Sequence, residues 1–203
     1  MKNISITSLI FCCLIAISCS EQRQHFTPLS ENASILAFGD SLTAGKGATI
    51  SQSYPAVLQQ LSQRNVINAG ISGEISANGL KRLPGLLEKY RPELVIICHG
   101  GNDILRRISS LQTKSNIIEM IRLAKSYNAQ VLLLAVPKPT LLVPPAEVYF
   151  EIAKSTAVEL DSDTMPATLK SSKLKSDTYH PNAAGYHYIA SQVFSRLSNL
   201  GAF

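Results

Sequence analysis

Short apolar runs alternate along the chain with longer segments in which apolar residues recur every three or four positions. Runs that are apolar at successive positions are typical of parallel β-strands buried on both faces, whereas a spacing of three or four is typical of amphipathic helices. The predicted strands are Ile35–Phe38, Val66–Ala69, Glu93–Cys98, Gln130–Val136 and the short Val158–Leu160. The predicted helices are Tyr54–Arg64, Glu74–Tyr90, Ile117–Asn128, Ala146–Ala157 and Pro181–Leu197.

The order of these elements predicts the fold class. Strands that alternate with helices favour a parallel sheet covered by helices on both faces. We therefore expect a single doubly wound α/β domain with a parallel sheet of about five strands, beginning near Ala33. Pro84, inside the second predicted helix, predicts a kink or a break there.

The first 18 residues are predicted to be a signal peptide rather than part of this domain. Lys2 provides a positive charge, and the apolar run Leu9–Ile17 is followed by small residues suited to cleavage. This run of nine residues is too short to span a bilayer, which takes about 20 residues. The protein is therefore expected to be exported.

The end of this segment, Ile17-Ser18-Cys19, resembles the lipobox of bacterial lipoproteins, in which cleavage precedes a cysteine that receives lipid. Ala16 differs from that pattern, because a larger aliphatic residue is usual there. Lipidation of Cys19 and ordinary cleavage nearby are both open. The protein is expected in the periplasm or as a membrane-anchored lipoprotein of a bacterial envelope. Residues 19–32 are expected to form a tether or an ordered lead-in, and residues 33–203 the domain.

Composition adds limits on size and stability. Cleavage before Cys19 leaves 185 of the 203 residues, enough for one domain with a full-sized core. Beyond Cys19 the only cysteine is Cys98, inside an apolar strand, so packing rather than disulfide bonds must stabilise the fold. The net charge of +5 falls to +4 without Lys2. The three lysines between positions 170 and 175 are expected to lie in a solvated loop, with contact to anionic lipid head groups as the alternative.

The first predicted strand ends in the turn Gly39-Asp40-Ser41. This turn places the Ser41 hydroxyl at the carboxyl edge of a parallel sheet, where open α/β folds bind their ligands. The glycine allows the sharp bend, and Asp40 is expected to stabilise the turn. Ser41 is thus a candidate nucleophile.

This turn fits neither of two related motifs. A phosphate-binding loop, G-x-x-x-x-G-K-[ST], fails because five residues separate Gly39 from Gly45 and because Lys46 is followed by glycine. The nucleophile elbow G-x-S-x-G fails because Thr43 stands at its last position. On this stretch alone an incidental serine is the simpler interpretation. Whether Ser41 is a nucleophile therefore depends on whether other segments bring a base and oxyanion donors to it.

Polar residues that follow the other strands are the possible partners. The segment Gly70–Gly73 follows the second predicted strand and Asn102 follows the third, so both reach the same edge of the sheet. Asp177 and His180 lie three residues apart just before the last predicted helix. At this spacing the carboxylate reaches the near nitrogen of the imidazole and leaves the other nitrogen free to meet Ser41.

Together these residues form a complete set for acyl transfer. A serine hydroxyl becomes a nucleophile when a neighbouring base takes its proton, and His180 has a suitable ordinary pKa near neutral pH. Asp177 is expected to orient the imidazole and to stabilise its charged form. The backbone N–H groups of Ser41 and Gly73 and the side-chain amide of Asn102 are candidate donors to the oxyanion, and each such donor is worth roughly 3 kcal/mol in the transition state.

Four blocks of the sequence, FGDSLTAG, NAGISGE, HGGND and DTYHPNAAGY, resemble the signature blocks of the SGNH (GDSL) hydrolases and occur in that family's order. The intervening ISANGLKRLPGLLEKYRPELVII resembles the bacterial thioesterase, lysophospholipase and arylesterase branch. The resemblance extends from about Ser34 to Leu197. It implies a flavodoxin-like three-layer sandwich with strand order 2-1-3-4-5.

The resemblance also implies roles for individual residues. The implied catalytic residues are Ser41, Asp177 and His180, and the implied oxyanion donors are Ser41, Gly73 and Asn102. Gly73 is implied rather than Gly70, because this branch uses the second glycine of NAGISG. The family acts on small or medium acyl substrates without a metal. We expect no cofactor and no nucleic-acid partner, a small acyl ester or thioester substrate, and possible membrane anchoring through Cys19, and the oligomeric state is not indicated.

Two features differ from the branch. His99 stands where an aliphatic residue is usual, and Val136–Pro145 differs from the expected substrate-loop sequence, so neither feature indicates a substrate preference. His99 is expected to be a packed residue at a strand end rather than a catalyst. Cys98 and His99 are poorly placed to pair, because successive side chains of a strand point to opposite faces. Asp103 is expected to support the Gly-Gly-Asn turn by hydrogen bonding.

The leading hypothesis is therefore a serine esterase that cleaves carboxylic esters or thioesters through an acyl-Ser41 intermediate. An acetylesterase acting on envelope carbohydrates is the alternative with the same fold. A non-catalytic envelope lipoprotein with a relict site is the alternative from another class of protein.

Overall fold

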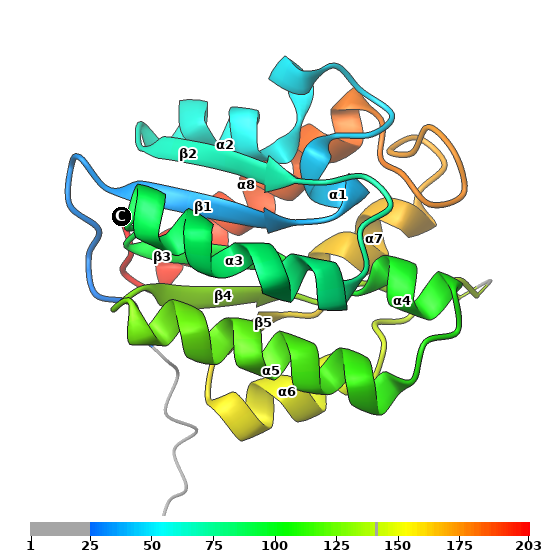
Figure 1. Cartoon of the computed structure of the whole chain (residues 1–203). Helices are drawn as coiled ribbons and strands as arrows, with labels where there is room; N and C mark the ends of the chain where they lie inside the picture. The colour runs from blue at the N-terminus through cyan, green and yellow to red at the C-terminus, as the bar shows by residue number, and fades with distance from the viewer. Residues whose placement is uncertain (1–24, 141) are drawn as a thin grey trace, which may run out of the picture.

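The computed structural model describes residues 25–140 and 142–203. Its centre is one parallel sheet in the order β2-β1-β3-β4-β5 (Figure 1). The strands are β1 (Ser34–Gly39), β2 (Asn65–Gly70), β3 (Leu94–Cys98), β4 (Gln130–Leu134) and β5 (Glu159–Asp161). The predicted signal peptide and the lipidation site at Cys19 lie outside the described residues.

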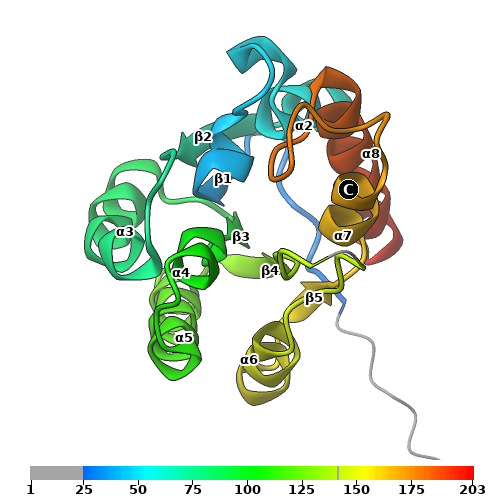
Figure 2. The same ribbon diagram turned by 90° about the vertical axis from the view of Figure 1, so that its right-hand side faces the viewer.

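Helices cover both faces of the sheet (Figure 2). One face carries α2 (Tyr54–Ser62), α7 (Thr164–Lys170) and α8 (Ala183–Asn199). The other carries α3 (Ser76–Tyr90) and α5 (Ser110–Ser126), with α6 (Val148–Thr156) beside α5. The short helices α1 (Ser41–Ala44) and α4 (Gly101–Leu105) follow β1 and β3, and a 3-10 helix, η1 (Ile50–Gln52), follows α1. This architecture and its strand order confirm the predicted three-layer fold.

The two central strands form the core of the molecule. Residues Ile35–Phe38 of β1 and all of β3 are fully buried, because helices lie against both faces of the sheet. This double burial explains why their sequences are apolar at successive positions instead of alternating.

The register of the central strands brings three loops to one edge of the sheet. Gly39, the last residue of β1, lies opposite Gly70 of β2 and Cys98 of β3. The loops that follow these strands therefore begin at the same level. A Cβ atom on Gly70 would lie 2.1 Å from the backbone nitrogen of Ala44 in α1, so only glycine allows α1 to pack this closely.

Helix α5 begins at Ser110, seven residues before the Ile117 predicted from apolar spacing. Its first two turns bury Thr113 and Asn116 instead of apolar side chains. The Thr113 hydroxyl donates to Asp103 of α4, and the Asn116 amide donates to the hydroxyl of Ser76 at the start of α3. The prediction missed these turns because polar contacts, which leave no apolar period, hold them in place.

Other differences are smaller. Helix α3 is continuous from Ser76 to Tyr90, so the predicted break at Pro84 does not occur. Leu83 and Leu87 on either side of the proline are fully buried and keep both halves of the helix on the sheet. Helix α7 was not predicted from the sequence. The short strand β5 was predicted and lies at the sheet edge beside β4.

The first described residues run beside the end of the chain. The Phe26 N–H donates to the Leu200 carbonyl oxygen and the Leu29 N–H to that of Ala202, both at 2.9 Å. The side chains of Phe26 and Leu29 are buried in the core. Among the described residues, no helix has the length and apolar character needed to cross a membrane.

Candidate active site

Ser41 is the first residue of α1, directly after the strand β1. The side chain of Asp40 caps this helix, because its Oδ1 accepts the N–H of Leu42 at 3.1 Å. Asp40 thus stabilises the turn, as expected from the sequence. Burial raises the pKa of Asp40, although the nearby His99 imidazole and the N–H groups of Leu42 and Gly101 oppose this rise.

His180 links Ser41 to Asp177. The His180 Nε2 lies 3.0 Å from the Ser41 Oγ, and the His180 Nδ1 lies 2.8 and 2.9 Å from the two carboxylate oxygens of Asp177. A proton on Nδ1 is therefore shared with the carboxylate, which leaves Nε2 as the acceptor for the serine hydroxyl. The structure brings together the three residues that the sequence singled out.

Asp177 is held in the orientation that this contact needs. Its Oδ1 accepts the backbone N–H groups of Tyr179 at 2.7 Å and His180 at 2.9 Å. Burial raises the pKa of Asp177, but these hydrogen bonds and the contact with the imidazole outweigh that effect and lower the pKa below its ordinary value. The carboxylate is half exposed whereas the imidazole is nearly buried, so water reaches only the outer end of the arrangement.

Short-range contacts fix the loop that carries His180. The Ser176 N–H donates to the His180 carbonyl oxygen at 2.9 Å. Asn182 accepts the Gly185 N–H at the start of α8 and donates to the Lys173 carbonyl oxygen, both at 3.0 Å. His180 is therefore placed by a hydrogen-bonded loop against the first turn of α8.

Gly73 and Asn102 lie on the other side of Ser41. Gly73 has a φ of 81°, in the left-handed region that favours glycine, and no protein group in the described part of the chain accepts its N–H. The Asn102 Nδ2 donates to the Glu74 carbonyl oxygen at 3.0 Å and approaches the Asp40 Oδ2 at 3.4 Å. One amide hydrogen of Asn102 is thus held, and the second has only a long contact.

These groups open on one cavity of about 650 Å³. Ser41, Gly73, Asn102 and His180 line it together. Apolar side chains form much of the rest of its wall: Ile104 and Leu105 of α4, Leu169 of α7, and Val136, Pro137, Pro139 and Val143 after β4. The cavity therefore places an apolar surface beside the serine hydroxyl.

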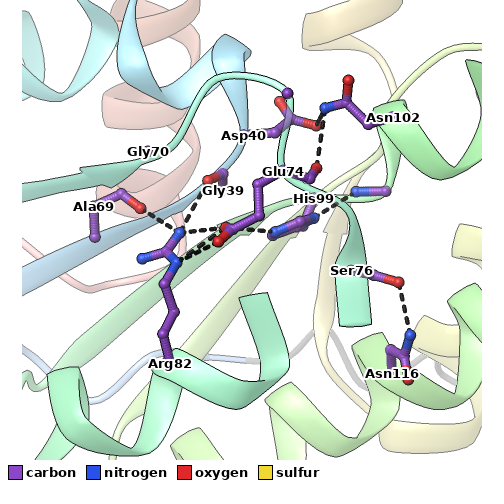
Figure 3. A network of polar contacts seen from close by, with 12 residues as sticks. Gly39, Asp40, Ala69, Gly70, Glu74, Ser76, Arg82, His99, Asn102 and Asn116 are labelled. Atoms are coloured by element: carbon purple, nitrogen blue, oxygen red, sulfur yellow. Dashed lines mark hydrogen bonds and ion pairs between the residues drawn. The ribbon is translucent and has the colours of Figure 1, made fainter. Parts of the chain in front are cut away.

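A buried polar network lies behind the cavity (Figure 3). The Arg82 guanidinium donates to the Glu74 carboxylate through Nε and Nη2 at 2.6–3.0 Å, and the His99 Nε2 meets the same carboxylate at 3.1 Å. Burial raises the pKa of Glu74, but the hydrogen bonds from His99 and Arg82 and the Arg82 charge lower it to about 2. Neither Glu74 nor Arg82 was singled out from the sequence. The one signal of this network in the sequence was His99, which stands where an aliphatic residue is usual.

The remaining candidates lie away from the reacting groups. His99 is fully buried, and Cys98 is a buried thiol whose pKa burial raises well above its ordinary value. Asp103 accepts hydrogen bonds from the N–H and hydroxyl groups of Ser76 and from the Thr113 hydroxyl, so it joins α4 to α3 and α5. Within the described ranges, no group of three or more His, Cys, Asp or Glu side chains is placed to hold a metal ion.

At the carboxyl edge of the α/β sheet a carboxylate contacts an imidazole and the imidazole contacts a serine, beside a Gly73 N–H that has no acceptor among the described residues. Serine hydrolases use this arrangement. Comparison with known proteins gives the same class. The chain belongs to the GDSL-like lipase/acylhydrolase family, whose model matches residues 37–188. It is therefore a GDSL-type hydrolase that acts on ester bonds.

Named relatives fall in the branch that the sequence resembles. "Thioesterase 1/protease 1/lysophospholipase L1" of Escherichia coli (strain K12) is 33% identical over 174 residues, which cover 82% of this chain and 84% of that protein. "Arylesterase" of Vibrio mimicus is 31% identical over 95% of this chain and 96% of that protein. The crystal structure of the psychrotrophic esterase EstA from Pseudoalteromonas sp. has a TM-score of 0.75 at 27% identity and covers 83% of this chain and 98% of that one.

The lowered pKa of Glu74 predicts a contribution to stability that depends on pH. Because the folded state binds this proton less tightly than the unfolded state, the contribution is complete above the ordinary pKa of 4.5 and is lost as the pH falls toward about 2. Glu74→Gln should destabilise the protein at pH 7 by about 3 kcal/mol, since it leaves a charged partner unpaired. It should also flatten the decline of stability at acid pH.

The measurement is the free energy of unfolding by urea, at a series of pH values, for the unaltered protein and for Glu74→Gln. Glu88→Gln, on α3 but exposed and without a described ion pair, is the matched control. Parallel curves for the protein and its Glu74→Gln variant between pH 5 and 2 would contradict the assigned contribution.

Proposed function

We propose that this protein is a serine esterase that cleaves carboxylic esters or thioesters through an acyl-Ser41 intermediate. The observation that carries the proposal is the continuous contact from Asp177 through His180 to Ser41, opening on a cavity that Gly73 and Asn102 also line. Family membership supports the same chemistry.

The geometry supports an ordinary two-step mechanism. In the first step the His180 Nε2 takes the Ser41 hydroxyl proton while the Oγ bonds to the substrate carbonyl carbon. The N–H groups of Ser41 and Gly73 and the second amide hydrogen of Asn102 bind the resulting oxyanion. The imidazolium then protonates the leaving oxygen or sulfur, and the acyl group stays on Ser41. Water attacks the acyl-serine in the same way, and the acid and free Ser41 are released.

The cavity supports acyl chains longer than acetyl. Its apolar wall, built by α4, α7 and the segment after β4, lies beside the serine and offers burial worth about 0.8 kcal/mol for each methylene group. Relatives named thioesterase, lysophospholipase and arylesterase agree with such substrates. The acetyl xylan esterase AlAXEase is a structural neighbour at 18% identity, which supports a shared fold alone, so we do not favour acetylated carbohydrates.

Two lysines favour a leaving group that carries negative charge. Lys46 and Lys175 line the cavity, and neither side chain has an acidic partner among the described residues, whereas Lys138, on the same wall, pairs with Glu147. The segments that carry Lys46 and Lys175 touch beside His180, since a Cβ on Gly47 would lie 2.2 Å from the Ser176 Oγ. Because His180 protonates the leaving group, these charges lie on the leaving-group side.

We also propose that the protein acts in a bacterial envelope, either anchored through lipid on Cys19 or released after ordinary cleavage. The basis is the amino-terminal sequence pattern. Mass spectrometry of the mature amino terminus should find a lipidated Cys19. An unmodified terminus downstream of Cys19 would exclude the lipid anchor and leave a released protein.

A fluorophosphonate, which reacts only with an activated serine, tests the proposed nucleophile. We expect one stoichiometric adduct, on Ser41, in the intact protein. Ser41→Ala should fold normally, take up no label and lose hydrolysis of aryl esters and acyl thioesters. Ser51→Ala, an exposed serine outside the cavity, is the matched control. Absence of an adduct on folded protein would favour a non-catalytic binding protein, whereas full turnover by Ser41→Ala would refute Ser41 as the nucleophile.

The role of the two lysines is tested with a matched pair of substrates. These are butyrate esters of 4-hydroxybenzoate, which is anionic, and of 4-hydroxybenzamide, which is neutral. The double variant Lys46→Gln, Lys175→Gln should lower kcat/KM for the anionic ester about 2- to 5-fold relative to the neutral one, as expected for solvent-accessible charges that together contribute about 0.5–1 kcal/mol. Added salt should shrink this difference. Lys173→Gln, from the same loop as Lys175 but outside the cavity lining, should leave the ratio of kcat/KM for the two esters unchanged. Equal losses for both esters would refute the charge preference.

A further inference from the structure

His99 is a fully buried polar side chain that the proposed reaction does not use. It lies at the end of β3, where the sequence led us to expect only a packed residue, and it does not line the cavity. A buried imidazole needs partners for both ring nitrogens. Its partners connect it to the loops beside the reacting serine.

The two hydrogen bonds of His99 define its tautomer. The Gly100 N–H donates to His99 Nδ1 at 2.9 Å, so Nδ1 carries a lone pair. The proton is therefore on Nε2, which donates to the Glu74 Oε2 at 3.1 Å. The imidazole thus joins the segment after β3, where α4 carries Asn102, to the loop after β2, which carries Glu74.

Glu74 stands directly between the two proposed oxyanion donors. It follows Gly73 in the chain, and its N–H donates to the Ile71 carbonyl oxygen at 3.2 Å, which closes the turn that contains Gly73. Its carbonyl oxygen accepts the Asn102 Nδ2 at 3.0 Å, so the same residue also orients the Asn102 amide (Figure 3). A shift of Glu74 would move both donors.

Arg82 holds the Glu74 carboxylate from the side opposite His99 (Figure 3). The same guanidinium donates through Nη2 to the Ala69 carbonyl oxygen at 2.8 Å and to that of Gly39 at 3.3 Å. It also lies 4.3 Å from the centre of the Phe38 ring. The carboxylate is therefore tied to the ends of β1 and β2 by Arg82 and to the end of β3 by His99.

We propose that His99 and Arg82 are positioning residues that act through Glu74 to set the Gly73 N–H and the Asn102 amide at the spacing that an oxyanion requires. This inference rests on the proposed function, because it assigns a purpose to donors of that reaction. The contacts exist before substrate binds, so the donors are preorganised. Preorganised donors act on the transition state more than on substrate binding.

The test compares two substitutions of His99 with a short neutral aryl ester as substrate. His99→Leu introduces the aliphatic type usual in related sequences and removes the donor to Glu74. It should lower kcat about 10- to 100-fold, as expected for reacting groups misplaced by about 1 Å, with KM nearly unchanged. His99→Gln keeps an N–H donor for Glu74 and should recover most of kcat. A residue that only fills space would give the opposite order, with leucine at least as active as glutamine.

Arg82 supplies a second test from the partly exposed end of the network. Arg82→Met should lower kcat with little change in KM, and Lys81→Met, an exposed neighbour on α3, should have no effect. This pair decides the question if a His99 variant does not fold, as judged by its Tm. Wild-type kcat in folded His99→Leu and Arg82→Met would overturn the inference. Fluorophosphonate labelling of Ser41 in the unaltered protein tests the reaction separately, so failure of one proposal is distinguishable from failure of the other.

Discussion

The parallel register of β2, β1 and β3 is the constraint on which the whole site depends. Because Gly39 lies opposite both Gly70 and Cys98, three loops leave the sheet at one level and bring Ser41, Gly73 and Asn102 to a single cavity. A slip of one residue in any of these strands would move the start of its loop along the sheet and separate these groups. The site therefore requires this one register of the three strands.

Buried carboxylates with hydrogen-bond partners lie between the apolar core and the cavity. Three buried carboxylates, those of Asp40, Glu74 and Asp103, each accept hydrogen bonds from residues of neighbouring segments. Isolated buried charges are costly, so such groups persist only where their partners are in place. The sheet therefore places the loops, and the carboxylates orient them.

Local patterns in the sequence were sufficient for the fold and for much of the candidate site. Apolar runs marked the strands, and the residues after these runs marked Ser41 and Asn102. The spacing of three before the last helix marked the Asp177–His180 pair, and the structure brings these residues to one place. The contact between Arg82, Glu74 and His99 could not be predicted in the same way. It joins residues 8 and 25 positions apart, and it depends on how α3 lies against the ends of three strands. The first turns of α5 escaped prediction for a related reason, because their buried side chains are polar.

Helix α8 runs from the loop that carries His180 to the part of the molecule where the first described residues lie. Its first turn supports the loop of His180, and its last turn leads to Leu200, where the backbone of Phe26 is bonded. A helix of 17 residues is about 25 Å long, so the chain upstream of residue 25 joins the domain far from the cavity. If the chain is anchored upstream of Phe26, its attachment lies at the end of the domain opposite the cavity, so the domain itself does not separate the cavity from dissolved acyl compounds.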